Sequence, residues 1–353
     1  MSRLSKKILI WGTGEIENQI DEKEINGEII GYIQSKKNKA MYKEKCVFGI
    51  DEVPNDYDYI IVASSYTDEI YAICKNRSIN MNKIIFLTKI NKKVGITDIK
   101  LIKEVLGRNF EYYCARMGIL QGTLFEENKR IYQQLNKRKN FEIKDEYLVP
   151  ITLDKYAPAG TIGNYFWQDL WAARLIYKSG IKTHFDIGSR IDGFIAHLLS
   201  MEIDVTLIDI REFPEKVEGL HTIIDDATTL QQVPNESIES MSALCSLEHF
   251  GLGRYGDPID PEACFRCFEE IQKKVKKGGK LYISLPIGKE RVEFNAHRVF
   301  YPSTIIDCFH DMNLEEFSCT AGGKIEYNVD IHRYDNDLHN GNYRYGMFYF
   351  TKQ

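Results

Sequence analysis

Several features that would place a protein in a class at once are missing from this chain of 353 residues. No stretch comes near the ~18 consecutive apolar residues of a membrane span. The apolar run near the amino terminus, ILIW at 8–11, is also too short for the core of a signal peptide. A long basic run is missing as well, since 46 Lys and Arg face 51 Asp and Glu, for a formal net charge of −5. Because nucleic-acid binders carry clustered positive charge, we expect no nucleic-acid partner and no membrane span.

The eight cysteines do not form a zinc motif. The one CxxC, Cys264 to Cys267, has no second Cys or His pair at zinc spacing and lies in a helical pattern. We therefore interpret both side chains as buried and predict no metal site. In a chain of this length without a secretion signal, reduced thiols in the cytoplasm are expected.

What the sequence does contain is two series of alternating strand and helix patterns, which predict an α/β protein with two Rossmann-like units. The first series occupies residues 1–95, and the second, longer one occupies residues 161–353. Residues 96–160 show helical patterns without a repeating strand signal, so we expect a helical linker region between the units. The join VKKGGKLYISLP, a basic helix end followed by a Gly–Gly stop and a buried type of strand, is typical of such folds.

Three carboxylates lie at the ends of three successive strand patterns in the second series: Asp186 in FDIGS, Asp209 in LIDIRE and Asp226 in IIDDAT. Ligands of parallel sheets bind beyond the carboxyl ends of the strands. Gly188 and Gly193 leave room for a ligand to approach the backbone of the first turn. We predict an adenosine-bearing cofactor, with its ribose on Asp209, its adenine amine near Asp226 and its tail over the turn at Gly188.

Two kinds of adenosine cofactor compete for this layout. A dinucleotide needs a GxGxxG turn that leads into a helix, whereas DIGSRIDGF has an acid before the first glycine and Arg190 in place of the second. An acid at that position suits a cofactor with a cationic amino-acid end, such as S-adenosylmethionine (SAM). For each aspartate taken alone, the alternative is a cap on the helix that follows its strand.

From about residue 160 to the end, the chain resembles an uncharacterised family allied to the class I SAM-dependent methyltransferases. The matching stretches include YFWQDLWAARLI, HFDIGSRIDGFIAHL, LIDIRE, SLEHFGLGRYGDPIDP, GGKLYISLPIG and FNAHRVFYP. The resemblance implies a seven-stranded methyltransferase-like sheet and a SAM site at Asp186, Gly188, Asp209 and Asp226. The other residues that we expect in the cofactor site are Ser189, Gly193, Ile210, Ala227 and Gln168.

Two loops carry side chains suited to the transfer step. A base that removes the acceptor's proton adds typically about 10²–10⁴-fold to the rate. We predict that His249, helped by Glu248, is this base, with His297 as the reserve. The alternatives are an orienting or capping role for His249 and a partly buried one for His297. The residues expected to hold a polar or anionic acceptor are Arg254, Tyr255, Asp257 and Arg298.

The first series carries a weaker nucleotide signal. GTGE at 12–15 follows a strand pattern, but Glu17 stands where a third glycine would fall and the second strand ends at Gln34, not at an acid. We therefore expect no NAD site. KILIWGTGE, IIGYIQS and DYIIVASSYTDEI are similar to small Rossmann-like domains of nucleotide-sugar and surface-glycan enzymes, which implies a substrate-holding or assembly role. The alternative is a domain without a ligand, which is either structural or dimerising. A dimerising domain would make the protein a homo-oligomer.

Three functions follow from these patterns. The first is a cytoplasmic SAM-dependent methyltransferase acting on an oxygen of a glycan precursor or nucleotide-linked sugar in surface polysaccharide biosynthesis. The second is a methyltransferase-like protein that binds a nucleotide-sugar without methylating it. The third is an NAD-dependent sugar oxidoreductase, against which Gln34 and Glu17 argue.

Overall fold

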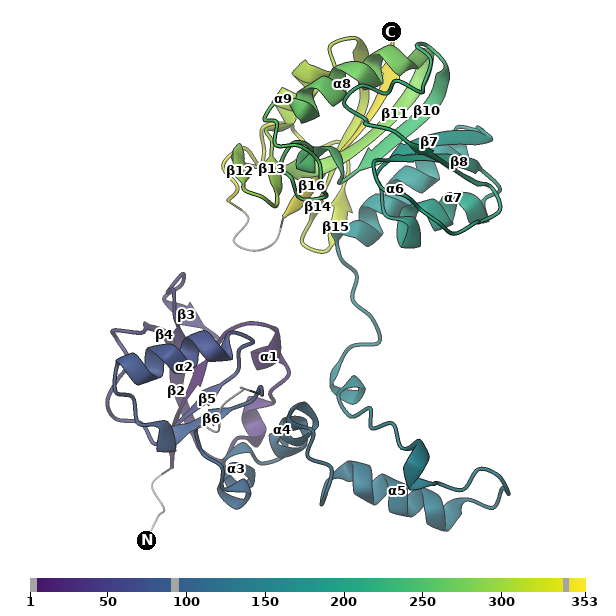
Figure 1. The fold of residues 1–353 in the computed structure, drawn as a ribbon. Helices are drawn as coiled ribbons and strands as arrows, with labels where there is room; N and C mark the ends of the chain where they lie inside the picture. Colours follow the sequence, from purple (N-terminus) through teal and green to yellow (C-terminus); the bar gives the residue numbers. More distant parts are fainter. Residues whose placement is uncertain (1–4, 90–94, 339–342) are drawn as a thin grey trace. The chain divides into compact units, whose positions relative to one another are not determined.

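The computed structural model describes residues 5–89, 95–338 and 343–353. It divides the chain into two compact units, Met1–Gly160 and Thr161–Gln353, each built around its own sheet (Figure 1). None of the helices in these described ranges has the length and apolar content needed to span a membrane.

The sheet of the first unit has the strand order β3-β4-β2-β1-β5-β6. All its neighbouring strands are parallel except β3 and β4. In β1 the last four of the five residues KILIW are buried, as expected for a strand covered on both faces. The strands are β1 Lys7–Trp11, β2 Glu28–Gln34, β3 Met41–Tyr42, β4 Lys45–Gly49, β5 Tyr59–Val62 and β6 Ile84–Phe86. The helices are α1 Glu15–Asn18, α2 Thr67–Asn76, α3 Ile99–Leu106, α4 Asn109–Met117 and α5 Leu124–Leu135.

Part of the segment predicted as a linker belongs to the core of the first unit. Ile102 and Leu106 of α3 and Phe110 of α4 are buried in one cluster with Ile8 and Ile61 of the sheet. By contrast, α5 has no buried residue. The packed core of this unit therefore extends through α4, beyond the boundary at residue 95 that the strand patterns suggest.

The second unit has an eight-stranded sheet in the order β15-β14-β16-β11-β10-β7-β8-β9, one strand more than expected. The strands from β9 to β11 are mutually parallel, and β16 runs antiparallel between β11 and β14. These strands are β7 Thr183–Ile187, β8 Asp204–Asp209, β9 Leu220–Ile224, β10 Ile238–Leu244, β11 Val275–Ile287, β14 Met312–Ala321, β15 Lys324–Glu326 and β16 Arg344–Lys352. A separate antiparallel ribbon consists of β12 Arg291–Glu293 and β13 His297–Val299.

Helices cover both faces of this sheet. The buried side chains of β11 alternate: Ile283 shares a cluster with α8 and α9, whereas its neighbour Tyr282 shares another with α6 and α7. The two helix pairs accordingly lie on opposite sides of the strands (Figure 1). The helices are α6 Asn164–Lys178, α7 Ala196–Ser200, α8 Ala263–Lys274 and α9 Pro302–Cys308.

The two cysteines of the CxxC are buried in α8, as interpreted from the sequence. Burial raises the pKa of the Cys264 thiol to about 12, so this side chain behaves as a small apolar one.

Candidate active site

A pocket of about 940 Å³ lies at the carboxyl ends of β7, β8 and β9 and against the loop that follows β10. It is lined by Ser189 after β7, Asp209 at the end of β8, Asp226 after β9 and His249 after β10. Parallel strands end at one edge of a sheet, which is why residues 60 positions apart in the sequence meet here. The volume is within the range of about 300–1,000 Å³ typical of small-molecule sites.

Most of the residues predicted to hold the cofactor line this pocket. Those that do are Gly188, Ser189, Asp209, Ile210, Asp226 and Ala227. Those that do not are Asp186, Gly193 and Gln168.

Asp186 lies beneath the pocket and shapes its first turn. Its Oδ1 accepts a hydrogen bond from the backbone N–H of Ser189 at 2.9 Å, and its Oδ2 accepts from the Ser189 hydroxyl at 2.8 Å and from the Ser242 hydroxyl. Burial raises the pKa of this carboxyl group to about 6. Asp186 is fully buried and does not line the pocket, so its predicted contact with the cationic end of a cofactor stays a prediction that this geometry does not support.

Gly188 and Gly193 have different roles in the same turn. Gly188 has a φ of +66° and lines the pocket, so a side chain there would be strained and would narrow the approach to the backbone. A Cβ on Gly193 would lie 2.5 Å from Oδ2 of the buried Asp169. Gly193 therefore makes room for a neighbouring side chain, not for a cofactor.

Gln168 lies one layer below the pocket. Its Oε1 accepts hydrogen bonds from the Ser284 hydroxyl at 2.6 Å and from the Cys245 thiol at 3.1 Å, and the side chain is buried. Cys245 itself lines the pocket in a left-handed conformation, with a φ of +50°. Burial raises the pKa of its thiol well above the ordinary value. Gln168 thus supports the floor of the pocket and does not reach the cofactor site directly.

The Asp209 carboxylate is held by Arg211, a residue that the sequence reading missed. Oδ1 accepts from the backbone N–H of Arg211 at 2.8 Å and from its Nε at 2.9 Å, and Oδ2 accepts from Nη2 at 2.8 Å. Burial opposes ionisation, but these hydrogen bonds outweigh it and keep the pKa of Asp209 below its ordinary value. Asp226 lines the neighbouring wall with one oxygen bonded to the backbone N–H of Thr228 at 2.9 Å.

His249 lies at the wall of the pocket as a neutral imidazole. Its Nδ1 is 2.6 Å from the carbonyl oxygen of Ala296. A carbonyl only accepts, so Nδ1 carries the proton and Nε2 is left as the acceptor. Burial lowers the pKa of His249 to about 4, which keeps the ring neutral at pH 7. The sequence-predicted base is therefore placed at the pocket with a nitrogen that can accept a proton.

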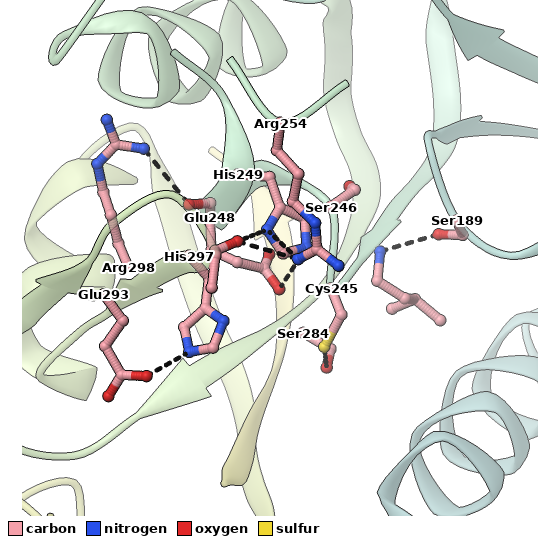
Figure 2. A network of polar contacts seen from close by, with 12 residues as sticks. Ser189, Cys245, Ser246, Glu248, His249, Arg254, Ser284, Glu293, His297 and Arg298 are labelled. Carbon is pink, nitrogen blue, oxygen red and sulfur yellow. Dashed lines mark hydrogen bonds and ion pairs between the residues drawn. The ribbon is translucent and has the colours of Figure 1, made fainter. Parts of the chain in front are cut away.

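Glu248 is buried behind His249, with its Oε1 3.6 Å from His249 Nε2. Burial raises the pKa of this carboxyl group to about 8. Near pH 7 the pair therefore consists of a protonated acid and a neutral imidazole (Figure 2). Glu248 does not line the pocket, so any effect that it has on a bound ligand passes through His249.

The predicted reserve base, His297, is set back from the pocket. Its Nε2 lies 3.4 Å from Glu293 Oε2, its ring meets that of Tyr343 edge-on at 4.5 Å, and the centre of its ring is 6.3 Å from that of His249 (Figure 2). It does not line the pocket, so its role as a second base at the acceptor stays a prediction.

Three of the four predicted acceptor residues, Arg254, Tyr255 and Asp257, line the pocket. The guanidinium groups of Arg211 and Arg254 lie over the Tyr255 ring, at 4.7 and 5.1 Å from its centre. The Asp257 carboxylate accepts from the backbone N–H groups of Gly251 and Tyr255 at 2.7 and 3.2 Å. Asp257 therefore orders its own loop, whereas the arginines and Tyr255 present surface to a ligand.

Arg298, the fourth, is buried and does not line the pocket. Its guanidinium group donates to the carbonyl oxygens of Glu248, Phe250 and Pro261 at 3.3, 2.6 and 3.1 Å. These bonds fasten the loop of residues 245–260 against the protein (Figure 2). In this structure Arg298 positions the loop that carries His249, and its contact with a substrate stays a prediction.

Family models match two parts of the chain. The model described as Caenorhabditis protein of unknown function, DUF268, matches residues 192–340, and the model described as C2185-like, N-terminal, matches residues 4–85. The first match confirms the predicted resemblance to an uncharacterised family over those residues. The comparison with curated proteins gave no match.

Solved structures similar to this chain resemble about half of it. An N1-methyltransferase of Burkholderia thailandensis bound to S-adenosylhomocysteine is 16% identical, with 53% of this chain and 78% of that chain covered and a TM-score of 0.38. The N-methyltransferase NodS of Bradyrhizobium japonicum, also with S-adenosylhomocysteine, is 13% identical, with 52% and 85% covered and a TM-score of 0.36. A SAM-dependent methyltransferase of Archaeoglobus fulgidus is 18% identical, with 53% and 94% covered and a TM-score of 0.37. The second unit itself has a Rossmann-like arrangement, with parallel strands β11-β10-β7-β8-β9 in one sheet.

Proposed function

We propose that the second unit is a SAM-dependent methyltransferase. The observation that carries this proposal is the meeting of Asp209, Asp226 and the Gly188 turn with His249 around one pocket at the carboxyl edge of the sheet. Two carboxylates at neighbouring strand ends suit the ribose hydroxyls and the amine of an adenosine. An acceptor nitrogen on the opposite wall suits the removal of a proton from a second substrate.

The residues of the pocket fit the cofactor as follows. Asp209 would accept hydrogen bonds from the ribose, Asp226 would lie near the adenine amine, and the tail would pass over Gly188 and Ser189. Asp209 can do this while bonded to Arg211, because a carboxylate has about four lone-pair sites and Arg211 uses three of them. When bound, SAM supplies a methyl group on a sulfonium centre.

Within this proposal His249 is the base for an oxygen acceptor. On methyl transfer the cofactor would leave as a neutral thioether, and the hydroxyl proton of the acceptor would pass to His249 Nε2. Neutral His249 is ready to accept because Ala296 fixes the other ring proton on Nδ1. Glu248 acts on the imidazolium that results, and its ionised form would stabilise that cation at 3.6 Å.

The proposed acceptor is a glycan precursor or nucleotide-linked sugar of surface polysaccharide synthesis, handled in the cytoplasm. Arg254 donates to the carbonyl oxygen of Ala296 at 3.0 Å, and in the described part of the chain no carboxylate forms an ion pair with it. A guanidinium group without a counter-charge suits a phosphate or carboxylate of the acceptor. The Tyr255 ring, 39% exposed, offers a flat face to a sugar.

One observation favours the second candidate, a protein that binds a nucleotide-sugar without methylating it. The lowered pKa of His249, about 4, makes the imidazole a weak base for a sugar hydroxyl. Binding alone would need only the pocket and its arginines.

Calorimetric titration of the full chain with SAM, S-adenosylhomocysteine and NAD tests the cofactor assignment. We expect both sulfur compounds to bind and NAD not to compete with them. If neither sulfur compound binds at high micromolar concentration, the methyltransferase proposal is lost. If they bind but no acceptor is methylated in assays with nucleotide-linked sugars, the binding-only candidate is favoured.

A further inference from the structure

The first unit has a pocket of its own, also of about 940 Å³, at the carboxyl ends of β1, β2 and β5. Within the sheet, β2 and β4 lie to one side of β1, and β5 and β6 lie to the other. The direction in which successive strands are added therefore reverses at β1. Open parallel sheets bind ligands at such a reversal. A Cβ on Gly12, which has a φ of +130°, would lie 2.3 Å from the carbonyl oxygen of Ala63, whereas one on Gly14 would meet nothing within 4 Å. The strand ends are thus packed tightly while the turn above them is open.

A half-buried cation lines this pocket without a negative partner. The guanidinium group of Arg116, on α4, donates to the Leu87 carbonyl at 3.0 Å and to the hydroxyls of Tyr112 and Thr88, each at 3.2 Å. All three acceptors are neutral, and across residues 5–89, 95–338 and 343–353 no carboxylate forms an ion pair with Arg116. Charged side chains removed from water are normally paired. The uncompensated charge therefore points to an anionic ligand.

A second cation lies two residues beyond the strand end at which NAD-binding folds carry an acid. Gln34 ends β2 and bonds within the protein: Nε2 donates to the Thr13 hydroxyl at 2.9 Å, and Oε1 accepts from the backbone N–H of Asn38 at 3.1 Å. Lys36 follows, exposed and lining the pocket. Its neighbour Lys37 pairs with Glu52, but Lys36 has no ion pair among the residues that the structure describes. This strand end therefore suits phosphate oxygens and offers no carboxylate to a ribose.

The remaining wall is aromatic and apolar. Tyr112 and Tyr156 meet edge-on at 5.0 Å, with Leu153 and Pro158 beside them. The lining also holds two acids, Glu15 and Glu69, which are exposed to water as Lys36 is, so the partly buried charge of the pocket is that of Arg116.

We propose that this pocket binds a nucleoside diphosphate, with its phosphates between Arg116 and Lys36 and its base against the aromatic wall. This site is independent of the one proposed for the second unit. The charges of this pocket do not suit NAD, because the end of β2 offers no acid to accept hydrogen bonds from the ribose of NAD.

Calorimetry on the full chain with UDP, GDP, ADP, inorganic phosphate and NAD tests this proposal. Saturating S-adenosylhomocysteine is present throughout to fill the second unit. At least one diphosphate should bind, more tightly than phosphate or NAD. Lys36→Glu and Gly14→Leu, which change exposed positions, should each weaken this binding by about tenfold or more, as should Arg116→Gln. Lys100→Glu, on the exposed face of α3 and outside the pocket, is the matched control and should have no effect.

The outcomes separate this site from the other one. Diphosphate binding that survives Asp209→Asn and is lost in Lys36→Glu supports the proposal, and an unchanged thermal unfolding profile shows that the variant is folded. The proposal is overturned by an absence of diphosphate binding, by binding that Lys36→Glu and Gly14→Leu leave unchanged, by binding lost only in Asp209→Asn, or by tighter binding of NAD.

Discussion

The guanidinium group of Arg211 donates to both carboxylate oxygens of Asp209, with N–O distances of 2.9 and 2.8 Å. The same group lies 4.7 Å from the centre of the Tyr255 ring. Arg211 therefore links the strand end that would hold the cofactor to the loop that would hold the acceptor. The carboxylate that it orients is the one on which the cofactor proposal depends.

Replacing Asp209 with Asn should weaken SAM binding. The amide keeps the shape but removes the charge that Arg211 orients and one acceptor for the ribose. Hydrogen bonds to charged groups contribute about 1.5–3 kcal/mol, so we expect a loss of roughly 10- to 100-fold in affinity by calorimetry. Arg211→Ala, which leaves the acid in place, should cost less. If Asp209→Asn and the parent chain bind SAM with equal affinity, the ribose does not bind at Asp209.

The rate of methyl transfer should depend on pH through two buried groups. His249 accepts a proton only when neutral, so activity should fall as the pH drops through its pKa of about 4. Ionised Glu248 would stabilise the imidazolium, so the rate should rise as the pH increases through about 8. Glu248→Gln should abolish this upper rise and keep the lower limb.

His249→Ala separates catalysis from binding. Turnover should fall by about 10²–10⁴-fold, because the base is lost, while the affinity for SAM stays the same. If the affinity for SAM and the turnover fall together, His249 has a structural role. The hydrogen bond from His249 to Ala296 would be enough to explain such a role.

Glu248 should also make stability depend on pH. Its pKa is raised in the folded state from an ordinary value of 4.5 to about 8, so between these values the folded chain binds more protons than the unfolded one. The contribution of Glu248 to the free energy of unfolding is therefore constant below about pH 4.5 and declines as the pH rises toward 8. Thermal unfolding of Glu248→Gln should show a smaller loss of Tm over this window than the parent chain. Parallel Tm profiles would mean that Glu248 is ionised in the folded protein.

The residues at strand ends were predictable, and those in the layer below them were not. Buried parallel strands give continuous apolar runs, so the positions of Asp209 and Asp226 follow from where those runs stop. Asp186, Gln168 and Arg298 are polar residues in the same motifs, but whether they face the pocket depends on the packing of a partner strand or loop. A strand such as β14 is hard to predict, because only one of its first five residues, MNLEE, is buried and they form no continuous apolar run. A signal for Arg211 did exist, since residues two apart in an extended segment share a face.

Arg298→Ala should destabilise the chain. Arg298 donates to the carbonyl oxygens of residues 248, 250 and 261, so its removal leaves one buried and two partly buried bonds unmade, at about 1–3 kcal/mol for a fully buried acceptor. We expect a lower Tm, together with a loss of turnover that follows from the disordered loop. Arg298→Lys should recover part of the Tm, because one ammonium can reach some of the same carbonyls. A normal Tm with a raised KM for the acceptor would instead restore the substrate contact expected from the sequence.

Arg254→Ala tests whether the acceptor is anionic. Arg254 lines the pocket and has its guanidinium group 5.1 Å from the centre of the Tyr255 ring, so its loss removes positive charge from the acceptor wall. For an acceptor with a phosphate group, KM should rise by roughly 10- to 100-fold, as expected for a charge-assisted hydrogen bond, with the affinity for SAM unchanged. For a neutral sugar of the same ring structure, KM should change little. Arg266→Ala is the matched control, because Arg266 also lines the pocket but is already paired with Asp260. If both variants change KM equally for both acceptors, the arginines act through the general field of the pocket. The proposal of an anionic acceptor would then be without its main argument.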